Sequence, residues 1–139
     1  NNHRPLLRLR WSDAPLRADA IRVPSWRQEN GDKRADPRGR VPGDVFDFTR
    51  VVGNSKQRRP WHPTQLNEGL VERCIKFTTP EGESVLDPFG GTGTTLRVCR
   101  RLSYPCTLIE IDPGYCAEIV KEHGMKRSEY IHRALWEVE

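Results

Sequence analysis

The sequence lacks both the cysteine spacing of a zinc site and the long apolar run of a membrane span. Its four cysteines lie 25, 7 and 10 residues apart, so the chain contains no Cys-x-x-Cys pair. We therefore expect no metal site, and since no signal peptide is recognisable, we expect free thiols in a reducing, cytoplasmic environment. No segment approaches the roughly 20 consecutive apolar residues that cross a bilayer, so no membrane partner is predicted.

Positive charge is concentrated in the first half of the chain, whereas apolar residues concentrate after residue 65. Residues 1–60 hold 14 lysines and arginines against 7 aspartates and glutamates, and residues 61–139 hold 9 against 12. A basic segment of this kind suits contact with phosphate, and a solvated, irregular arm has the same composition. Prolines interrupt any long helix here, so we predict a basic, loop-rich segment over 1–60, with a possible short strand at 45–52.

Alternating helices and strands are predicted in the second half. Helical spacing of apolar residues predicts a helix over 66–78, capped by Thr64 or Asn67. There follow a strand at 84–86, a helix over about 95–102, a strand at 106–111, a helix around 115–120 and a last short helix that Ser128 could cap. This alternation favours a parallel α/β sheet with crossover connections. We divide this half into a ligand-binding subdomain, 61–124, and a C-terminal helix or tail, 125–139.

The stretch Val85–Thr95, VLDPFGGTGTT, is typical of a short strand that runs into a glycine turn and then a helix. Such turns hold nucleotide-like ligands, because the backbone approaches the ligand closely and the helix N-terminus supplies N–H groups. No lysine follows Gly93, which excludes a P-loop, and Leu96 replaces the third glycine of a dinucleotide fingerprint. S-adenosylmethionine has no phosphates, so its loop can begin with an acidic residue such as Asp87.

Glu110 ends the second predicted strand, 19 residues after Gly91. A carboxylate at this place can accept hydrogen bonds from both hydroxyls of a cofactor ribose, as in dinucleotide-binding sheets. Two plainer interpretations stay open at this point. Glu110 could be a solvated carboxylate at a strand end, and Asp87 could be only a turn or N-cap residue.

Three segments in order resemble the C-terminal part of the DNA amino-methyltransferases: HPTQLNEGLVERCI at 62–75, VLDPFGGTGTT at 85–95 and LIEIDPGYC at 108–116. Members of this family methylate adenine N6 or cytosine N4, and the chain is similar to the group whose catalytic motif precedes the cofactor motifs. The stretch 39–65 resembles the segment that leads into the cofactor region of that group. The resemblance implies an α/β, partial Rossmann-like methyltransferase fold, S-adenosylmethionine as cofactor and double-stranded DNA as partner.

The resemblance also implies which residues contact the cofactor. Residues 62–65 match a turn that closes over the methionine end of the cofactor, although Leu66-Asn67 replaces the family's following Lys-Pro. Glu110 matches the acid that binds the ribose, and Ile111 matches a side chain that packs on the adenine. The implied cofactor-binding residues are His62, Thr64, Gln65, Asp87, Pro88, Phe89, Gly90, Gly91, Thr92, Gly93, Thr94, Thr95, Glu110 and Ile111.

The chain has no Pro-Pro pair, so it lacks the Asp/Asn/Ser-Pro-Pro-aromatic motif with which this family holds the target amine and stacks on the flipped base. We therefore predict no catalytic residue here and no activity by the chain alone. Because the chain begins at Asn1, we expect the catalytic motif in a missing N-terminal half or in a second chain. Two strands make half of a doubly wound sheet, so we expect an exposed strand edge and possible oligomers through it.

Basic residues surround Trp26, in a region that follows the target-recognition segment in the family's layout. Six are predicted to contact DNA phosphates or guanine edges: Arg22, Arg27, Lys33, Arg34, Arg38 and Arg40. In the alternative, these residues pair with Asp32, Asp36, Asp44 and Asp47 within a scaffold loop. The tryptophans Trp11, Trp26 and Trp61 are interpreted as packing residues rather than base stackers.

Two functions of other classes compete with the methyltransferase. The first is a non-catalytic module that binds cofactor or DNA as the partner of another chain, which the missing Pro-Pro motif favours. The second is a nicotinamide-dependent oxidoreductase, which the leucine at position 96 and the lack of a visible hydride-transfer site disfavour.

Overall fold

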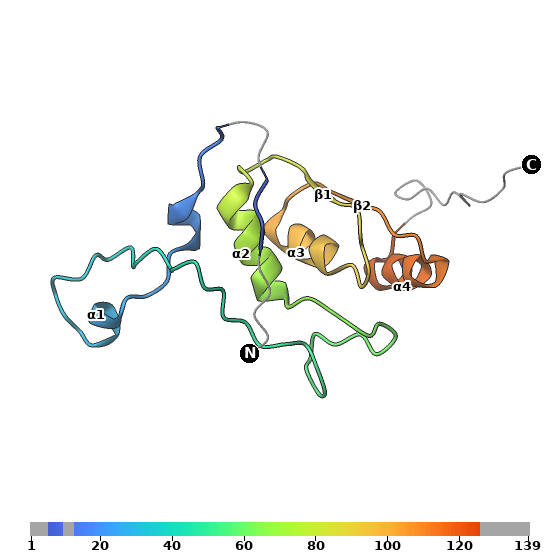
Figure 1. Cartoon of the computed structure of the whole chain (residues 1–139), viewed down its shortest axis with the longest axis horizontal. Helices are drawn as coiled ribbons and strands as arrows, with labels where there is room; N and C mark the ends of the chain where they lie inside the picture. The colour runs from blue at the N-terminus through green and yellow to red at the C-terminus, as the bar shows by residue number, and fades with distance from the viewer. Residues whose placement is uncertain (1–5, 10–12, 126–139) are drawn as a thin grey trace, which may run out of the picture.

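The regular elements lie mainly in the second half of the chain, as the computed structural model in Figure 1 shows. The structure describes residues 6–9 and 13–125. In chain order the elements are the 3-10 helix η1 (Ala18–Ile21), α1 (Trp26–Glu29), α2 (Glu68–Thr78), β1 (Val85–Asp87), α3 (Thr94–Leu102), β2 (Cys106–Leu108) and α4 (Pro113–His123). The predictions for Trp11 and for a final helix capped by Ser128 lie outside the described residues.

The two strands form a parallel pair, which confirms the predicted sheet type. Val85 is in register with Cys106, and Asp87 with Leu108, and α3 makes the crossover between the strands. The second strand was predicted to reach residue 111, but it ends at Leu108. Its ladder continues for one more bond, from the Ile109 N–H to the Asp87 carbonyl at 2.8 Å, before the chain turns into α4.

A small apolar core lies between α2, α3 and the inner face of the sheet. Val71 and Ile75 of α2 pack against Val98 and Cys99 of α3, and Val85 of the sheet lies against this cluster. The amphipathic helices were therefore predicted correctly, but α2 starts later than residue 66. Asn67 is its N-cap, because its side-chain oxygen accepts a hydrogen bond from the Gly69 N–H at 2.8 Å.

The outer face of the sheet has no covering layer within the described part of the chain. Leu86 of β1 is 63% exposed, and Ile109, which follows β2 and continues its alternation, is 54% exposed. Ile111 and Phe89, which follow the strand ends, are 66% and 87% exposed. Apolar side chains on a sheet normally pack against a second layer, and the described residues supply none for this face.

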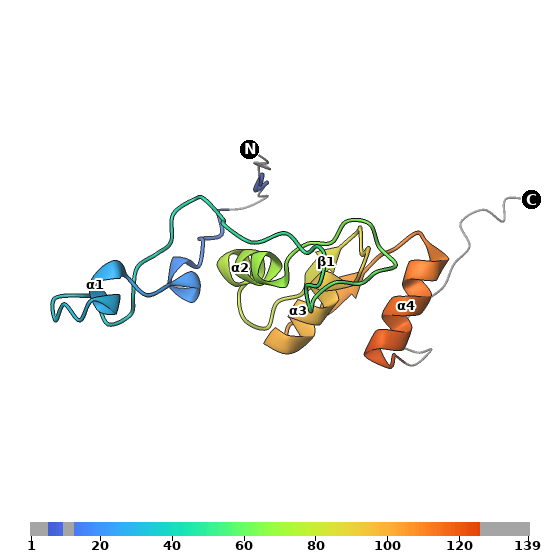
Figure 2. The same ribbon diagram turned by 90° about the horizontal axis from the view of Figure 1, so that it is seen from below.

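Residues 22–42, called the arm here, project away from the body that contains α2, α3 and α4 (Figures 1 and 2). An isolated bridge between Val23 and Arg40 closes the base of the arm. Gly39 has a φ of +85°, and a Cβ there would lie 2.3 Å from the Val23 carbonyl oxygen, so the bridge requires glycine. Ser25 and Gln28 form a capping box that starts α1.

Two sequence predictions in the first half are wrong. Residues 45–52 form no strand: the described structure offers them no partner strand, and Val45 and Val52 are exposed. Trp26 is not a packing residue, because it is 72% exposed and α1 contains no buried residue. Trp61, in contrast, is half-buried and its ring lies 5.4 Å from that of Tyr115.

No helix in residues 6–9 or 13–125 has the length and apolar composition needed to cross a bilayer.

Candidate cofactor site

The glycine turn, residues 88–93, connects β1 to α3 in a conformation that suits glycine. Gly91 and Gly93 have φ values of +53° and +72°, in the left-handed region that side chains rarely adopt. A Cβ at Gly90 would lie 2.8 Å from the Leu108 side chain, and the Gly90 N–H donates to the Ile109 carbonyl at 2.7 Å. The turn is therefore held tightly against the carboxyl end of β2.

Asp87 braces this turn from within. Its Oδ1 accepts a hydrogen bond from the Phe89 N–H at 3.0 Å, and its Oδ2 accepts one from the Thr95 hydroxyl at 2.6 Å. Thr92 and Thr94 are buried, with their hydroxyl oxygens 2.8 Å apart. The structure thus directs all three threonine hydroxyls at the protein, so this segment would meet a ligand through its backbone and through Phe89.

Glu110 is not a solvated carboxylate at a strand end. Its Oε2 accepts a hydrogen bond from the Gly91 N–H at 2.5 Å, and its Oε1 accepts one from the Asp112 N–H at 2.8 Å. The same side chain therefore ties the glycine turn to the loop that leads into α4. Each carboxylate oxygen has a second lone pair, so further donors can still be accepted.

The His62 turn, residues 61–65, stands beside the glycine turn. The His62 Nε2 lies 3.3 Å from the position that a Cβ on Gly91 would take, and its ring packs on Tyr115 with 4.8 Å between centroids. Its Nδ1 accepts a hydrogen bond from the Thr64 N–H at 3.2 Å. Gln65 instead braces the preceding loop: its Oε1 accepts from the Arg59 N–H at 2.9 Å.

His62, Gly91 and Glu110 are therefore brought together at the carboxyl ends of the two strands, where ligands bind in open α/β sheets. The cavity beside His62 has a volume of only about 90 Å³, whereas pockets for small ligands span roughly 300–1,000 Å³. A larger cavity of about 460 Å³ lies near Arg17 and Tyr104, at the opposite ends of the strands. The polar groups converge beside the smaller cavity, so the described residues there line one wall of a candidate site.

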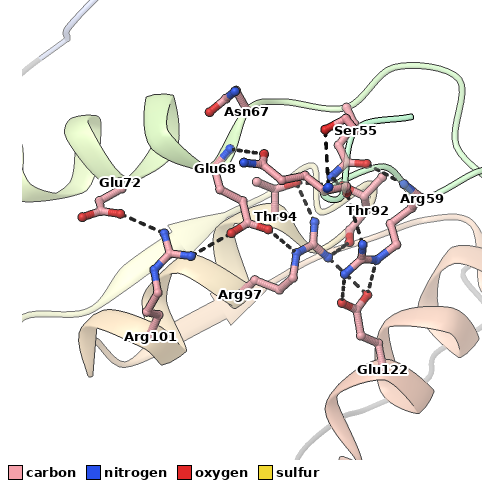
Figure 3. A network of polar contacts seen from close by, with 12 residues as sticks. Ser55, Arg59, Asn67, Glu68, Glu72, Thr92, Thr94, Arg97, Arg101 and Glu122 are labelled. Atoms are coloured by element: carbon pink, nitrogen blue, oxygen red, sulfur yellow. Dashed lines mark hydrogen bonds and ion pairs between the residues drawn. The ribbon is translucent and has the colours of Figure 1, made fainter. Parts of the chain in front are cut away.

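A network of ion pairs joins α2, α3 and α4 behind this wall (Figure 3). This network was not predicted from the sequence. Arg97 pairs with Glu68 and Glu122, and Arg59 pairs with Glu122. The pKa of Glu122 is lowered mainly by its hydrogen bond with Arg59. The positive charge of Arg97 lowers this pKa further. The spacing of Arg97 within α3 carries no signal that separates it from the exposed arginines that follow.

The four cysteines are free thiols. Burial raises the pKa of each thiol, and that of Cys106 to about 12. These thiols stay protonated near neutral pH and contribute packing rather than a nucleophile.

The predicted DNA-binding residues of the arm fall into two groups. Arg34 pairs with Asp32 at 2.9 Å and Arg38 with Asp36 at 3.0 Å, and these bonds lower the pKa of both carboxyls. Arg22 pairs with Asp19 and donates to the Gly39 carbonyl. Within the described chain Arg27, Lys33 and Arg40 are exposed and form no ion pair. Three of the six, Arg22, Arg34 and Arg38, therefore have the ion pairs that the scaffold interpretation expects, although Asp44 and Asp47 take no part in the ion pairs of the described residues.

Comparison with known proteins gives this arrangement a context. A family model described as DNA methylase matches residues 2–122, which is most of the chain. The chain belongs to this DNA methylase family. The match confirms the resemblance and the partial Rossmann-like fold that it implied.

Individual relatives support the same family assignment. The type II methyltransferase M.HpaI of Haemophilus parainfluenzae is 42% identical over 106 residues, which are 75% of this chain and 32% of that relative. M.BglII of Bacillus subtilis is 39% identical over 105 residues, covering 70% of this chain and 29% of the relative. M.ScaI of Streptomyces caespitosus is 34% identical over 104 residues, covering 70% of this chain and 34% of the relative. The chain thus spans about a third of the length of these relatives.

Proposed function

We propose that this chain is the cofactor-binding part of an S-adenosylmethionine-dependent DNA methyltransferase that acts on adenine N6 or cytosine N4. The observation that carries the proposal is the convergence of His62, Gly91 and Glu110 at the carboxyl ends of β1 and β2. Membership of the DNA methylase family supports it. The main alternative remains a non-catalytic module that binds cofactor or DNA for another chain.

The residues fit this cofactor well. The glycine turn offers backbone without side chains in the way, and Glu110 offers carboxylate oxygens to the ribose hydroxyls. His62 and the exposed Phe89 would border the remainder of the molecule. When bound, S-adenosylmethionine supplies a methyl group on a sulfonium. The contribution of this chain is to hold and orient the cofactor for an amine presented by other residues.

No residue of the chain is assigned to the transfer step, because the sequence has no Pro-Pro motif. The bare outer face of the sheet supports a place for the part that carries it. Leu86, Ile109 and Ile111 would pack against the remaining strands and helices of a complete methyltransferase. The small cavity beside His62 fits this view, since the catalytic part would supply the opposite wall.

Calorimetric titration of the chain tests cofactor binding directly. We expect S-adenosylmethionine to bind. We expect nicotinamide adenine dinucleotide neither to bind nor to compete, because Leu96 of α3 replaces the third glycine of the dinucleotide fingerprint. Circular dichroism establishes that the chain is folded. A folded chain that binds the dinucleotide in preference would overturn the proposal.

The unpaired basic residues of the arm are expected to contact duplex phosphates more than the paired ones. We expect Arg27→Gln with Lys33→Gln to reduce the slope of log Kd against log salt by about 2, since each lost phosphate contact removes ~0.9. The matched control is Arg34→Gln with Arg38→Gln, which removes the same charge from residues already paired with Asp32 and Asp36. Fluorescence anisotropy with a labelled duplex measures both, and equal slopes for the two pairs would contradict a specific contact.

A further inference from the structure

Arg97 is nearly buried and binds four segments at once. Its side chain is 10% exposed, and its Nε donates to Glu68 Oε1 at 3.1 Å. Its Nη1 donates to the Thr92 carbonyl at 2.7 Å and to Glu122 Oε2 at 3.2 Å, and its Nη2 donates to the Thr94 hydroxyl at 3.0 Å. One guanidinium therefore joins α2, the glycine turn, the start of α3 and α4 (Figure 3).

Only arginine can fill this position. Its planar fork directs several donors in fixed directions, whereas lysine has a single ammonium on a flexible stem. Two carboxylates, those of Glu68 and Glu122, compensate the buried charge. The remaining donors are directed at the Thr92 carbonyl and the Thr94 hydroxyl, so Arg97 restrains the glycine turn from its inner side.

The same network reaches the His62 turn. Glu122 binds Arg59 as well as Arg97, and the Arg59 N–H donates to the side chain of Gln65. Glu68 adds a second route, because its N–H donates to Gln57 Oε1 at 3.0 Å, and Gln57 accepts from Gln65 through its carbonyl at 2.6 Å. Two loops that are separate in sequence are thus fixed to a common polar centre.

We propose that Arg97 is a positioning residue that holds the glycine turn and the His62 turn in the arrangement that receives the cofactor, without touching the cofactor. This inference rests on the proposed function. It goes beyond it, because the residue acts from the interior side of the site, through Thr92, Thr94 and Glu122, rather than through contact with the ligand.

The test compares Arg97→Met with Arg101→Met in the full chain. Arg101 follows on the same helix and pairs with Glu68 and Glu72, but it does not contact the glycine turn. Two readouts are used at a temperature where circular dichroism shows both variants folded: the Kd for S-adenosylmethionine, and amide hydrogen exchange over residues 91–95. We expect Arg97→Met to weaken binding about tenfold or more and to speed exchange in this segment, whereas Arg101→Met stays within about twofold on both.

Thr94→Val is the second variant, because it removes one acceptor of Arg97, together with the contact to the Thr92 hydroxyl, and leaves every ion pair in place. It keeps the proposal testable if Arg97→Met fails to fold, and a weaker change in the same direction is expected. Wild-type affinity and exchange in folded Arg97→Met, or equal losses in Arg97→Met and Arg101→Met, would overturn the proposal. The exchange measurement needs no ligand, so a wild-type chain that binds no cofactor would count against the proposed function while exchange still decides the role of Arg97.

Discussion

Replacing Glu110 with alanine is expected to weaken S-adenosylmethionine binding by roughly tenfold to a hundredfold. The carboxylate accepts hydrogen bonds from Gly91 and Asp112 in the structure and is proposed to accept from the ribose as well. Hydrogen bonds to a charged group contribute about 1.5–3 kcal/mol, which corresponds to this range of affinity. Calorimetry on the folded variant measures the effect. The matched control is Glu83→Ala, an exposed carboxylate whose side chain has no hydrogen bond or ion pair within the described chain.

A ligand that lacks the ribose hydroxyls separates direct contact from bracing. The 2′,3′-dideoxy analogue of S-adenosylhomocysteine, compared with S-adenosylhomocysteine itself, completes a double-mutant cycle with Glu110→Ala. If Glu110 binds the ribose, removal of the hydroxyls costs affinity in the wild type and little in the variant. If Glu110 only braces Gly91 and Asp112, the two losses add, and the ribose assignment is wrong.

The sequence predicted the parts of the fold that depend on local pattern. Apolar spacing located α2, α3 and α4, since a helix that buries one face must repeat about every 3.6 residues. The glycine turn and Glu110 were predicted through the resemblance to methyltransferases, and they lie together at the strand ends. The helix signals lie within a dozen or so neighbouring residues, whereas the resemblance rests on three segments in order between residues 62 and 116.

The failures concern contacts between distant segments. Residues 45–52 alternate weakly, but a strand also needs a partner, and none lies beside them in the described structure. Trp26 was assigned to packing on residue type alone, yet this residue is 72% exposed. In the sequence, nothing distinguishes Arg97 from Arg100 and Arg101, the exposed arginines of the same helix. Its role depends on Glu68 and Glu122, which lie 29 and 25 residues away in the chain.

Methyl transfer is expected only when this chain is combined with a polypeptide that carries the Pro-Pro motif. The partner to test is the part of M.HpaI outside the match, which covers 32% of that relative, with a Pro-Pro pair in this part as the requirement. Incorporation of labelled methyl groups into duplex DNA measures activity. We expect none above background from either polypeptide alone and clear incorporation from the mixture. Activity of the 139-residue chain by itself would contradict the assignment of the transfer step to other residues.

The outer face of the sheet is the surface on which we expect the catalytic part to dock. Burial of a leucine or isoleucine side chain contributes about 1.5–3 kcal/mol, so a carboxylate at Leu86 or Ile109 would oppose docking strongly. Both side chains are exposed in the chain alone, and therefore Leu86→Asp and Ile109→Asp are expected to abolish the restored activity while leaving the melting temperature nearly unchanged. Val45→Asp is the control, since this valine is 72% exposed and does not line the cavity beside His62. If all three variants complement equally well, the catalytic part docks elsewhere, and the bare sheet face needs another occupant.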